Sequence, residues 1–319
     1  MPAVLFVKTS SLGDVVHHMP AVTEARSHLP EAHVAWIVEE AYAPLVALHP
    51  AVNEVIPVAT RRWRHELMKA SAWSEVRHFV RSIRKRRYDD IVDTQGLVRS
   101  ALIAKLARGR RHGYDAASIR EPFAANFYDV RHAVPRTLHA IARNRTLTAL
   151  ALGYQSAGAP DFGLQRERFR RDQSPPYAVL LHATARREKE WPEPNWVALG
   201  RALSQQGLIA MLPWGTAEER DRSERLAAQL PAAKVPDRVP LDRVASLLAG
   251  ASVVVGVDTG LLHLAAALAV PLVAIFVGSE PGLTGPMGQG PISIVGGKGN
   301  LPSVEEVASA AAGVFGGRT

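Results

Sequence analysis

The sequence predicts an α/β protein made of two doubly wound, Rossmann-like domains. Stretches of apolar, β-branched residues, typical of strands buried on both faces, alternate with stretches that favour helices. The alternation begins at residue 4 and begins again at residue 177, after a stretch rich in Gly, Pro, Arg and Gln. The length of 319 residues also exceeds what one domain usually holds, so we expect two domains whose parallel sheets face one crevice.

In the first domain, predicted over residues 1–155, strands and helices alternate from the start. A linker follows over residues 156–176. The aperiodic residues 113–135 are expected to form an irregular loop, and loops of that length are usually functional. The expected strands are 4–7, 33–40, 53–59 and 88–96, and the expected helices are 15–29, 41–49, one ending near 87, 97–107 and 139–152.

The second domain, predicted over residues 177–319, repeats this pattern. A capping box, Ser303 with Glu306, predicts a terminal helix, which could pack back on the first domain. The expected strands are 177–183, 208–212, 252–257 and 271–278, and the expected helices include 195–206 and 261–269.

Composition favours a soluble, cytoplasmic protein. No apolar run is long enough to span a membrane, cysteine is absent, and the first residues are too short and strand-like for a signal peptide. The net charge of +8 lies entirely in residues 1–155, which hold 22 Lys and Arg against 14 Asp and Glu. This surplus predicts an acidic partner such as phosphates, sugar acids or an anionic membrane surface, and at this step it is also compatible with nucleic acid. Solvated helix faces are the alternative.

The turn in residues 252–269 is the strongest candidate for an anion site. A buried strand runs into a helix through Asp258, Thr259 and Gly260. The first N–H groups of such a helix are unpaired and its dipole adds positive charge, so a diphosphate could bind there. An ordinary capped turn is the alternative, with Asp258 or Thr259 as the cap.

Two features of the first domain could serve catalysis or the binding of an acidic group. Asp14 follows the first strand, at the edge of the sheet where ligands bind, so it is a candidate general base. Its alternative role is to cap the helix, and one residue can fill both roles. Arg61, Arg62 and Arg64 follow the third strand and could grip carboxylate or phosphate, unless they form only an exposed helix start.

Several other classes lack their signatures. We find no Asp-x-Asp motif, no Walker A loop and no Gly-x-Gly-x-x-Gly after the first strand. The histidines show no paired spacing for a metal, and His17 and His18 lie on different faces of one helix. Aromatic residues are only 6% and do not alternate with basic ones, so no nucleic-acid partner is expected.

Four motifs occur in a characteristic order along the chain: Lys8-Thr9-Ser10-Ser11-Leu12-Gly13-Asp14, Trp191-Pro192, Pro213-Trp214-Gly215 and Asp258-Thr259-Gly260 followed by His263. Together they resemble the bacterial lipopolysaccharide heptosyltransferases, which form a GT-B family, glycosyltransferase family 9. The resemblance covers nearly the whole chain. The segments 61–64 and 120–123 are similar to the enzymes of this family that add the first heptose.

The resemblance implies an inverting transfer of heptose from ADP-heptose to the Kdo-bearing lipid A inner core, without metal or other cofactor. It also implies an enzyme that is peripheral on the cytoplasmic face of the inner membrane. Transfer to a later core heptose is the first alternative. A non-catalytic module that binds anions or nucleotides is the alternative from a different class.

The resemblance also assigns roles to single residues. Asp14 matches the catalytic base, Lys189 matches the lysine that neutralises donor phosphate, and Glu219 matches the acid that holds the ribose. Ala185 stands where a second hydroxyl residue is expected, so a contact from that position would be lost. The other implied donor contacts are Thr184, Arg186, Asp258, Thr259, Gly260 and His263, and the implied acceptor contacts are Ser10, Arg61, Arg62, Arg64 and Arg120.

Overall fold

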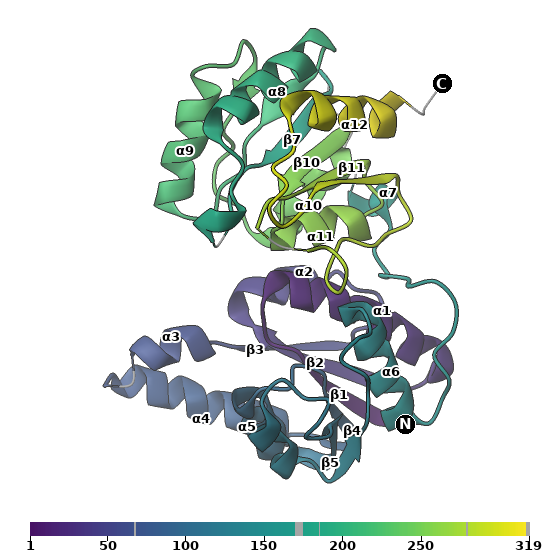
Figure 1. The fold of residues 1–319 in the computed structure, drawn as a ribbon. Helices are drawn as coiled ribbons and strands as arrows, with labels where there is room; N and C mark the ends of the chain where they lie inside the picture. The colour runs from purple at the N-terminus through teal and green to yellow at the C-terminus, as the bar shows by residue number, and fades with distance from the viewer. Residues whose placement is uncertain (67, 170–174, 185, 279, 317–319) are drawn as a thin grey trace. The chain divides into compact units, whose positions relative to one another are not determined.

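The computed structural model confirms an α/β fold with two parallel sheets (Figure 1). The chain divides after Leu164 into two compact units, and the division falls inside the stretch predicted as a linker. That stretch also holds buried Phe162 and the short helix α7 (Arg166–Phe169). The structure describes residues 1–66, 68–169, 175–184, 186–278 and 280–316.

The sheet of the first unit has the order β3-β2-β1-β4-β5-β6, with all neighbours parallel. The order reverses between β1 and β4, which makes this pair the switch point where ligands bind in such folds. Val7 pairs with Asp93, so the loops after these two strands start side by side. The strands are β1 (Ala3–Val7), β2 (His33–Glu39), β3 (Glu54–Val58), β4 (Arg87–Asp93), β5 (Arg108–Tyr114) and β6 (Val130–His132).

Helices cover both faces of this sheet. The buried helix α1 (Leu12–His28) packs with α6 (Ala140–Leu152) on one face, and α4 (Ala70–Arg84) packs with α5 (Val98–Leu106) on the other. The second layer closes a core that includes Leu5, Ile37 and Phe79. Shorter elements are η1 (Glu40–Tyr42), α2 (Ala43–Val46), α3 (Thr60–His65) and η2 (Pro122–Phe127).

The second unit repeats the topology with the order β12-β11-β10-β7-β8-β9. Its switch point lies between β7 and β10, where Leu181 pairs with Gly256. Every residue of β7, β10 and β11 is buried, as their unbroken apolar letters predict. The strands are β7 (Tyr177–Leu181), β8 (Ile209–Met211), β9 (Ala233–Lys234), β10 (Val253–Val257), β11 (Leu272–Phe276) and β12 (Ile292–Gly296).

The terminal helix belongs to the second unit. Its residues Val307 and Ala311 are buried in the core of that unit, where the helix contacts α8 and strands β10 to β12. This corrects the expectation that it packs back on the first domain. The helices are η3 (Arg187–Lys189), α8 (Glu193–Gln205), α9 (Ala217–Ala227), α10 (Leu241–Gly250), α11 (Gly260–Ala267) and α12 (Val304–Gly316).

The sequence-based assignment missed four strands that lie toward the sheet edges: β5, β6, β9 and β12. The first half of β5 alternates exposed arginines with partly buried residues, and the other three are only two to five residues long. The expected irregular loop over 113–135 is also wrong, because it contains the end of β5, η2 and β6. Edge strands are partly solvated, so they lack the continuous apolar run that identifies a central strand.

Candidate active site

Asp258 is the centre of a polar cluster at the switch point of the second unit. One carboxylate oxygen, Oδ2, lies 2.5 Å from Lys189 Nζ, and Oδ1 lies 3.9 Å from His263 Nε2. The Thr184 hydroxyl donates to the Asp258 carbonyl oxygen over 2.9 Å. Residues from the loop after β7 and from the turn after β10 therefore meet, as the sequence predicts for two neighbouring parallel strands.

The turn after β10 leads directly into helix α11. Thr259 is the N-cap in extended conformation, with φ −144° and ψ 161°, and Gly260 is the first helical residue. The Thr259 side chain makes no capping hydrogen bond, so Thr259 does not fill the side-chain capping role offered as the alternative. The helix start thus presents backbone N–H groups beside the Lys189 ammonium, which suits an anionic ligand.

The loop that carries Lys189 is held at both ends. Trp191 is fully buried, and its indole N–H donates to the Pro302 carbonyl over 3.0 Å. On the other side, a Cβ at Gly278 would lie 2.6 Å from the Glu188 carbonyl oxygen, so only glycine allows this approach. The Trp191-Pro192 motif is therefore a structural anchor for the loop.

Two other predicted donor residues lie farther out. Arg186 is exposed and lies 3.5 Å from Glu188, so it is not brought into the Asp258 cluster. Ala185 falls outside the described residues. Glu219 has a role that the sequence reasoning overlooked: it closes a capping box with Thr216 at the start of α9, and its Oε2 accepts from the Gly215 N–H over 2.7 Å.

In the first unit, Asp14 lies in the first turn of α1. Ser11, not Asp14, is the N-cap, which corrects the predicted capping role. Asp14 is the third helical residue, and its Oδ2 accepts from the Ser11 N–H over 2.8 Å and from the Ser11 hydroxyl over 3.0 Å. Within the described residues, its other oxygen, Oδ1, accepts no hydrogen bond.

The loop before Asp14 rests on buried polar groups. The Lys8 ammonium is buried and donates to the Thr94 carbonyl over 2.9 Å. Burial lowers the pKa of Lys8, while Asp14 and Asp93 raise it, and Arg120 also acts on this charge. Asp14 and Arg120 therefore share one electrostatic neighbourhood. Burial raises the pKa of Asp93, against the hydrogen bonds it receives from Ser100, Tyr128 and two backbone N–H groups.

Gln95 is a positioning residue that the sequence reasoning did not identify. Its side-chain oxygen accepts from the Thr9 and Ser10 N–H groups, each over 3.1 Å, and so fixes the loop before Asp14. Ser10, a predicted acceptor contact, is buried there. A polar residue that follows the strand beside β1 is the signal that could have revealed this role.

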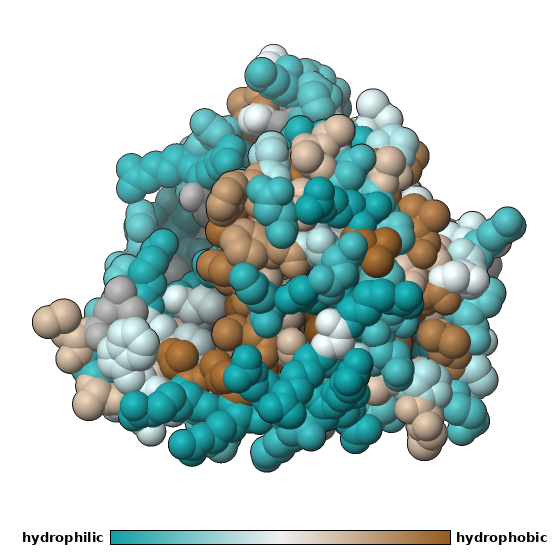
Figure 2. Space-filling model, turned by 90° about the horizontal axis from the view of Figure 1, so that it is seen from below, coloured by the Kyte–Doolittle hydropathy of each residue, from teal (hydrophilic) through white to brown (hydrophobic). Residues whose placement is uncertain are grey.

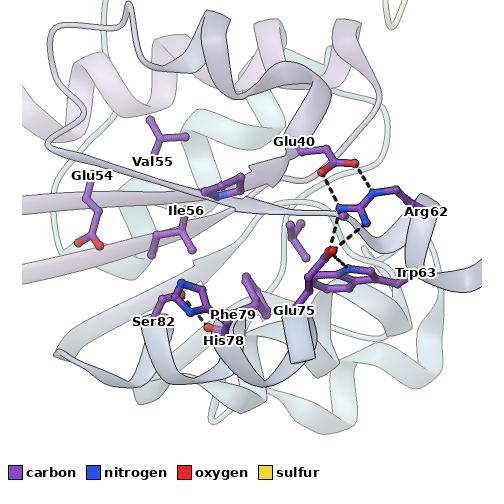
Figure 3. A pocket seen from close by; sticks show the side chains of 13 residues that line it. Glu40, Glu54, Val55, Ile56, Arg62, Trp63, Glu75, His78, Phe79 and Ser82 are labelled. Carbon is purple, nitrogen blue, oxygen red and sulfur yellow. Dashed lines mark hydrogen bonds and ion pairs between the residues drawn. The ribbon is translucent and has the colours of Figure 1, made fainter. Parts of the chain in front are cut away.

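The arginines after β3 do not act alike. Arg62 is paired with two carboxylates, Glu40 at 3.1 Å and Glu75 at 2.8 Å (Figure 3). Its guanidinium is thus already engaged within the protein, and its role as an acceptor contact stays a prediction. Arg61 lies over the Tyr42 ring. Arg64 and Arg120 are both exposed, and neither makes an ion pair within the described residues.

A cavity of about 330 Å³ lies between β3 and α4 in the first unit (Figure 3). Arg62, Trp63 and Glu75 line its end near α3, and the Trp63 indole N–H donates to Glu75 over 2.9 Å. These groups already bind one another, so the cavity is framed by an internal network rather than by open ligand contacts.

Neither a membrane span nor a metal cluster is found in the part of the chain that the structure describes. No helix there is long and apolar enough to cross a bilayer. No three His, Cys, Asp or Glu side chains there are grouped so that they could hold a metal ion.

Comparisons with known proteins agree with one another. The model of glycosyltransferase family 9 (heptosyltransferase) matches residues 76–312. Lipopolysaccharide heptosyltransferase 1 of Salmonella typhimurium is 42% identical, over 95% of this chain and 96% of its own length. The corresponding protein of Pseudomonas aeruginosa is 44% identical, over 91% of this chain and 83% of its own. The structure of E. coli heptosyltransferase WaaC with ADP matches with a TM-score of 0.89 at 38% identity, covering 98% of both chains.

Proposed function

This chain belongs to glycosyltransferase family 9, the heptosyltransferases, and from that premise we propose that it transfers a heptose from ADP-heptose to a Kdo residue of the lipid A inner core. The observation that carries this choice is the 42% identity to a heptosyltransferase 1 over nearly the full length, against 26% to the heptosyltransferase 2 of the same organism. Membership in an enzyme family sets aside the non-catalytic binding module.

The donor would bind to the second unit, at the switch point between β7 and β10. A diphosphate at the start of α11 would meet backbone N–H groups and the Lys189 ammonium, and Thr184 and His263 lie within the same cluster. The ADP in the similar E. coli structure supports a nucleoside diphosphate as the leaving group. As the glycosidic bond breaks, ADP gains negative charge, and Lys189 would stabilise it.

Asp258 holds the Lys189 side chain in place before the donor binds. A diphosphate beside its carboxylate would add negative charge, and Lys189 is the cation within contact of that carboxylate. Shared between the two anions, the ammonium offsets the repulsion between them. Glu219, with one oxygen committed to the capping box, would accept from the adenosine ribose through its other oxygen, Oε1.

The acceptor would bind to the first unit, where Asp14 would act as general base. Its Oδ2 holds the helix start, and its Oδ1 is left to take the proton from the attacking hydroxyl. The new bond joins that oxygen to the anomeric carbon as the bond to ADP breaks on the opposite face, so the configuration inverts. Ser10, Arg61, Arg64 and Arg120 are the proposed contacts to the anionic acceptor.

The acceptor is a lipid, so the enzyme would work at the cytoplasmic face of the inner membrane as a peripheral protein. The positive charge confined to residues 1–155 supports this placement, because the anionic surface and the acidic sugar would both be bound by the first unit.

One reaction tests the proposal. The protein is incubated with ADP-heptose and Kdo-lipid A, with and without EDTA, and ADP release and product mass are measured. We expect release in both conditions and a product heavier by one heptose, and Asp14→Asn is the control for background hydrolysis. Transfer only to an acceptor that already bears heptose would favour a later core position, and no ADP release with either acceptor would refute the proposal.

A further inference from the structure

We propose that the α3–α4 hairpin, residues 60–84, is the surface by which this protein docks on an anionic lipid bilayer, with Met68 and Trp73 entering the headgroup region. The inference rests on the proposed function, because a lipid-anchored acceptor places the reaction at a membrane. It adds the part of the first unit that makes the contact.

The hairpin extends from the edge of the first unit next to β3 (Figure 1). At its tip Met68 is 99% exposed and, at the start of α4, Trp73 is 54% exposed. In Figure 2, the end of the molecule where this hairpin lies carries brown and pale side chains bordered by strongly hydrophilic ones. Single exposed apolar residues are common, but tryptophan beside positive charge is typical of membrane interfaces.

The charge of the hairpin decides the nature of its partner. Residues 60–84 contain seven Lys and Arg against two Glu, a surplus of five, and Lys85, Arg86 and Arg87 follow directly. Both glutamates are already paired, Glu66 with Lys69 at 2.7 Å and Glu75 with Arg62 at 2.8 Å. Among the described residues, the other cations of the hairpin have no carboxylate partner, and they would be attracted by anionic lipids.

Helix α4 presents Arg77 and Arg81 on the side opposite its buried residues. Ala72, Phe79 and Ile83 are buried on the side that faces β3. Trp73, Arg77 and Arg81, spaced by four residues, are exposed and therefore lie in one row along the opposite side. Exposed Met68 and Trp73 near the tip, followed by Arg77 and Arg81, suit a helix that lies on a bilayer surface.

The hairpin is braced and is tied to the proposed acceptor site. Arg62 joins α3 to α4 through Glu75. The Thr60 hydroxyl donates to Glu39, whose own N–H donates to the Thr9 carbonyl over 3.1 Å, in the loop before Asp14. A bilayer contact on this hairpin would thus hold a lipid-anchored sugar on the same edge of the sheet as the proposed base.

A single label tests the contact. Because the chain has no cysteine, Met68→Cys gives one thiol for an environment-sensitive fluorophore. We expect its emission to shift to the blue with vesicles of phosphatidylethanolamine and phosphatidylglycerol, to stay unchanged with phosphatidylcholine alone, and to revert in high salt. The same label at Leu150→Cys, which is 48% exposed on α6, should not shift. A label at 68 that stays in water while the protein binds vesicles would refute the hairpin contact.

A matched pair of charge variants tests the electrostatic part. The double variant Arg77→Gln with Arg81→Gln should lower vesicle partitioning roughly 30-fold, since each basic residue near an anionic surface contributes about 1 kcal/mol. Arg108→Gln with Arg131→Gln removes the same charge from exposed positions on β5 and β6 and should have little effect. Equal losses in the two pairs would overturn the proposal.

Both double variants should transfer heptose to a deacylated, soluble Kdo acceptor at the wild-type rate. If neither the wild type nor the two variants transfer heptose, the proposed function fails, whatever the vesicle result. If all transfer and the hairpin pair still binds vesicles fully, only the docking surface fails. Binding to RNA without binding to vesicles would likewise overturn the docking proposal.

Discussion

Lys189 Nζ and Asp258 Oδ2 lie 2.5 Å apart and join the loop after β7 to the turn after β10. Both side chains are mostly buried, and the ammonium is held beside the first residues of α11. If the ion pair is purely structural, its loss should lower the stability of the second unit without changing the kinetic constants. If Lys189 contacts donor phosphate, its loss should change the donor KM and kcat, so kinetics can separate the two roles.

Lys189→Ala is expected to raise the donor KM and to lower kcat, because ADP gathers charge in the transition state. A lost contact to a charged group corresponds to roughly ten- to a hundredfold in kcat/KM. Steady-state rates at varied ADP-heptose concentration measure both constants. Arg187→Ala, an 87% exposed cation two residues away, is the control and should behave as wild type. Normal kinetics in Lys189→Ala would leave the lysine as a structural partner only.

Arg61→Ala and Arg120→Ala are expected to raise the acceptor KM by roughly tenfold or more each, with little change in the donor KM, because each loses a charge-assisted contact to the acidic acceptor. Kinetics with Kdo-lipid A at saturating donor provide the measurement. A rise in the donor KM with an unchanged acceptor KM would contradict the assignment of substrates to units.

Arg62→Ala is expected to act differently from Arg61→Ala, because its guanidinium joins Glu40 and Glu75 within the protein. The change leaves two carboxylates facing each other, so we expect faster amide exchange in α3 and at the start of α4. Hydrogen exchange followed by mass spectrometry on both variants gives the comparison. Protection equal to that of wild type would mean that the network does not brace the hairpin.

How far the sequence could predict this fold depended on burial. Residues 252–257 are predicted as a strand because no polar side chain follows Ser252, and the structure has β10 at Val253–Val257, wholly buried. From such strands a parallel sheet follows, with ligand-binding loops at the carboxyl ends of its strands. The order of the strands, both switch points and the contact between Lys189 and Asp258 came from the structure. The half-solvated strand β5, Arg108–Tyr114, carries arginines at its start and gave no such signal.

Side-chain partners were less predictable than positions. Nothing in the letters around Arg62 shows that Glu75, thirteen residues later on another helix, will neutralise it. The same holds for Gln95, which reaches a loop more than eighty residues earlier. Such contacts are set by tertiary packing, so the structure was needed to tell which arginine is already bound.

Stability is expected to fall in mild acid because of His49. It is buried, its Nδ1 accepts from the Ala51 N–H over 3.2 Å, and burial lowers its pKa to about 4. The unfolded chain, with an ordinary histidine pKa near 6.5, therefore binds the proton first. The stability is complete above that value and is lost as the pH falls toward 4.

Between pH 7 and pH 5 this one group should reduce the free energy of unfolding by about 2 kcal/mol. Urea titrations at the two pH values measure the difference, and His49→Gln should reduce it by a similar amount. His65→Gln, at an exposed position on α3, should retain the full pH dependence. An undiminished dependence in His49→Gln would place the effect on other buried histidines, such as His182.

The two carboxylate oxygens of Asp14 give it two separable roles. Oδ2 binds the Ser11 N–H and hydroxyl at the start of α1, and Oδ1 is proposed to take the acceptor proton. A sugar hydroxyl is too weak an acid to lose its proton unaided, so a base is required as it attacks. Asparagine keeps one oxygen for the helix start and nearly the same shape, but it cannot take up a proton.

Asp14→Asn should therefore keep its fold and its affinity for ADP while kcat falls by roughly 10²–10⁴, the range for loss of a general base. Asp14→Ala should lose the same activity and, in addition, about 1 kcal/mol of stability, because the Ser11 N–H loses its partner. Thermal melts, ADP titrations and steady-state rates on the two variants separate these effects. Near-normal turnover in the asparagine variant would mean that Asp14 only stabilises the start of α1. The base would then have to be another group near Lys8 in the first unit.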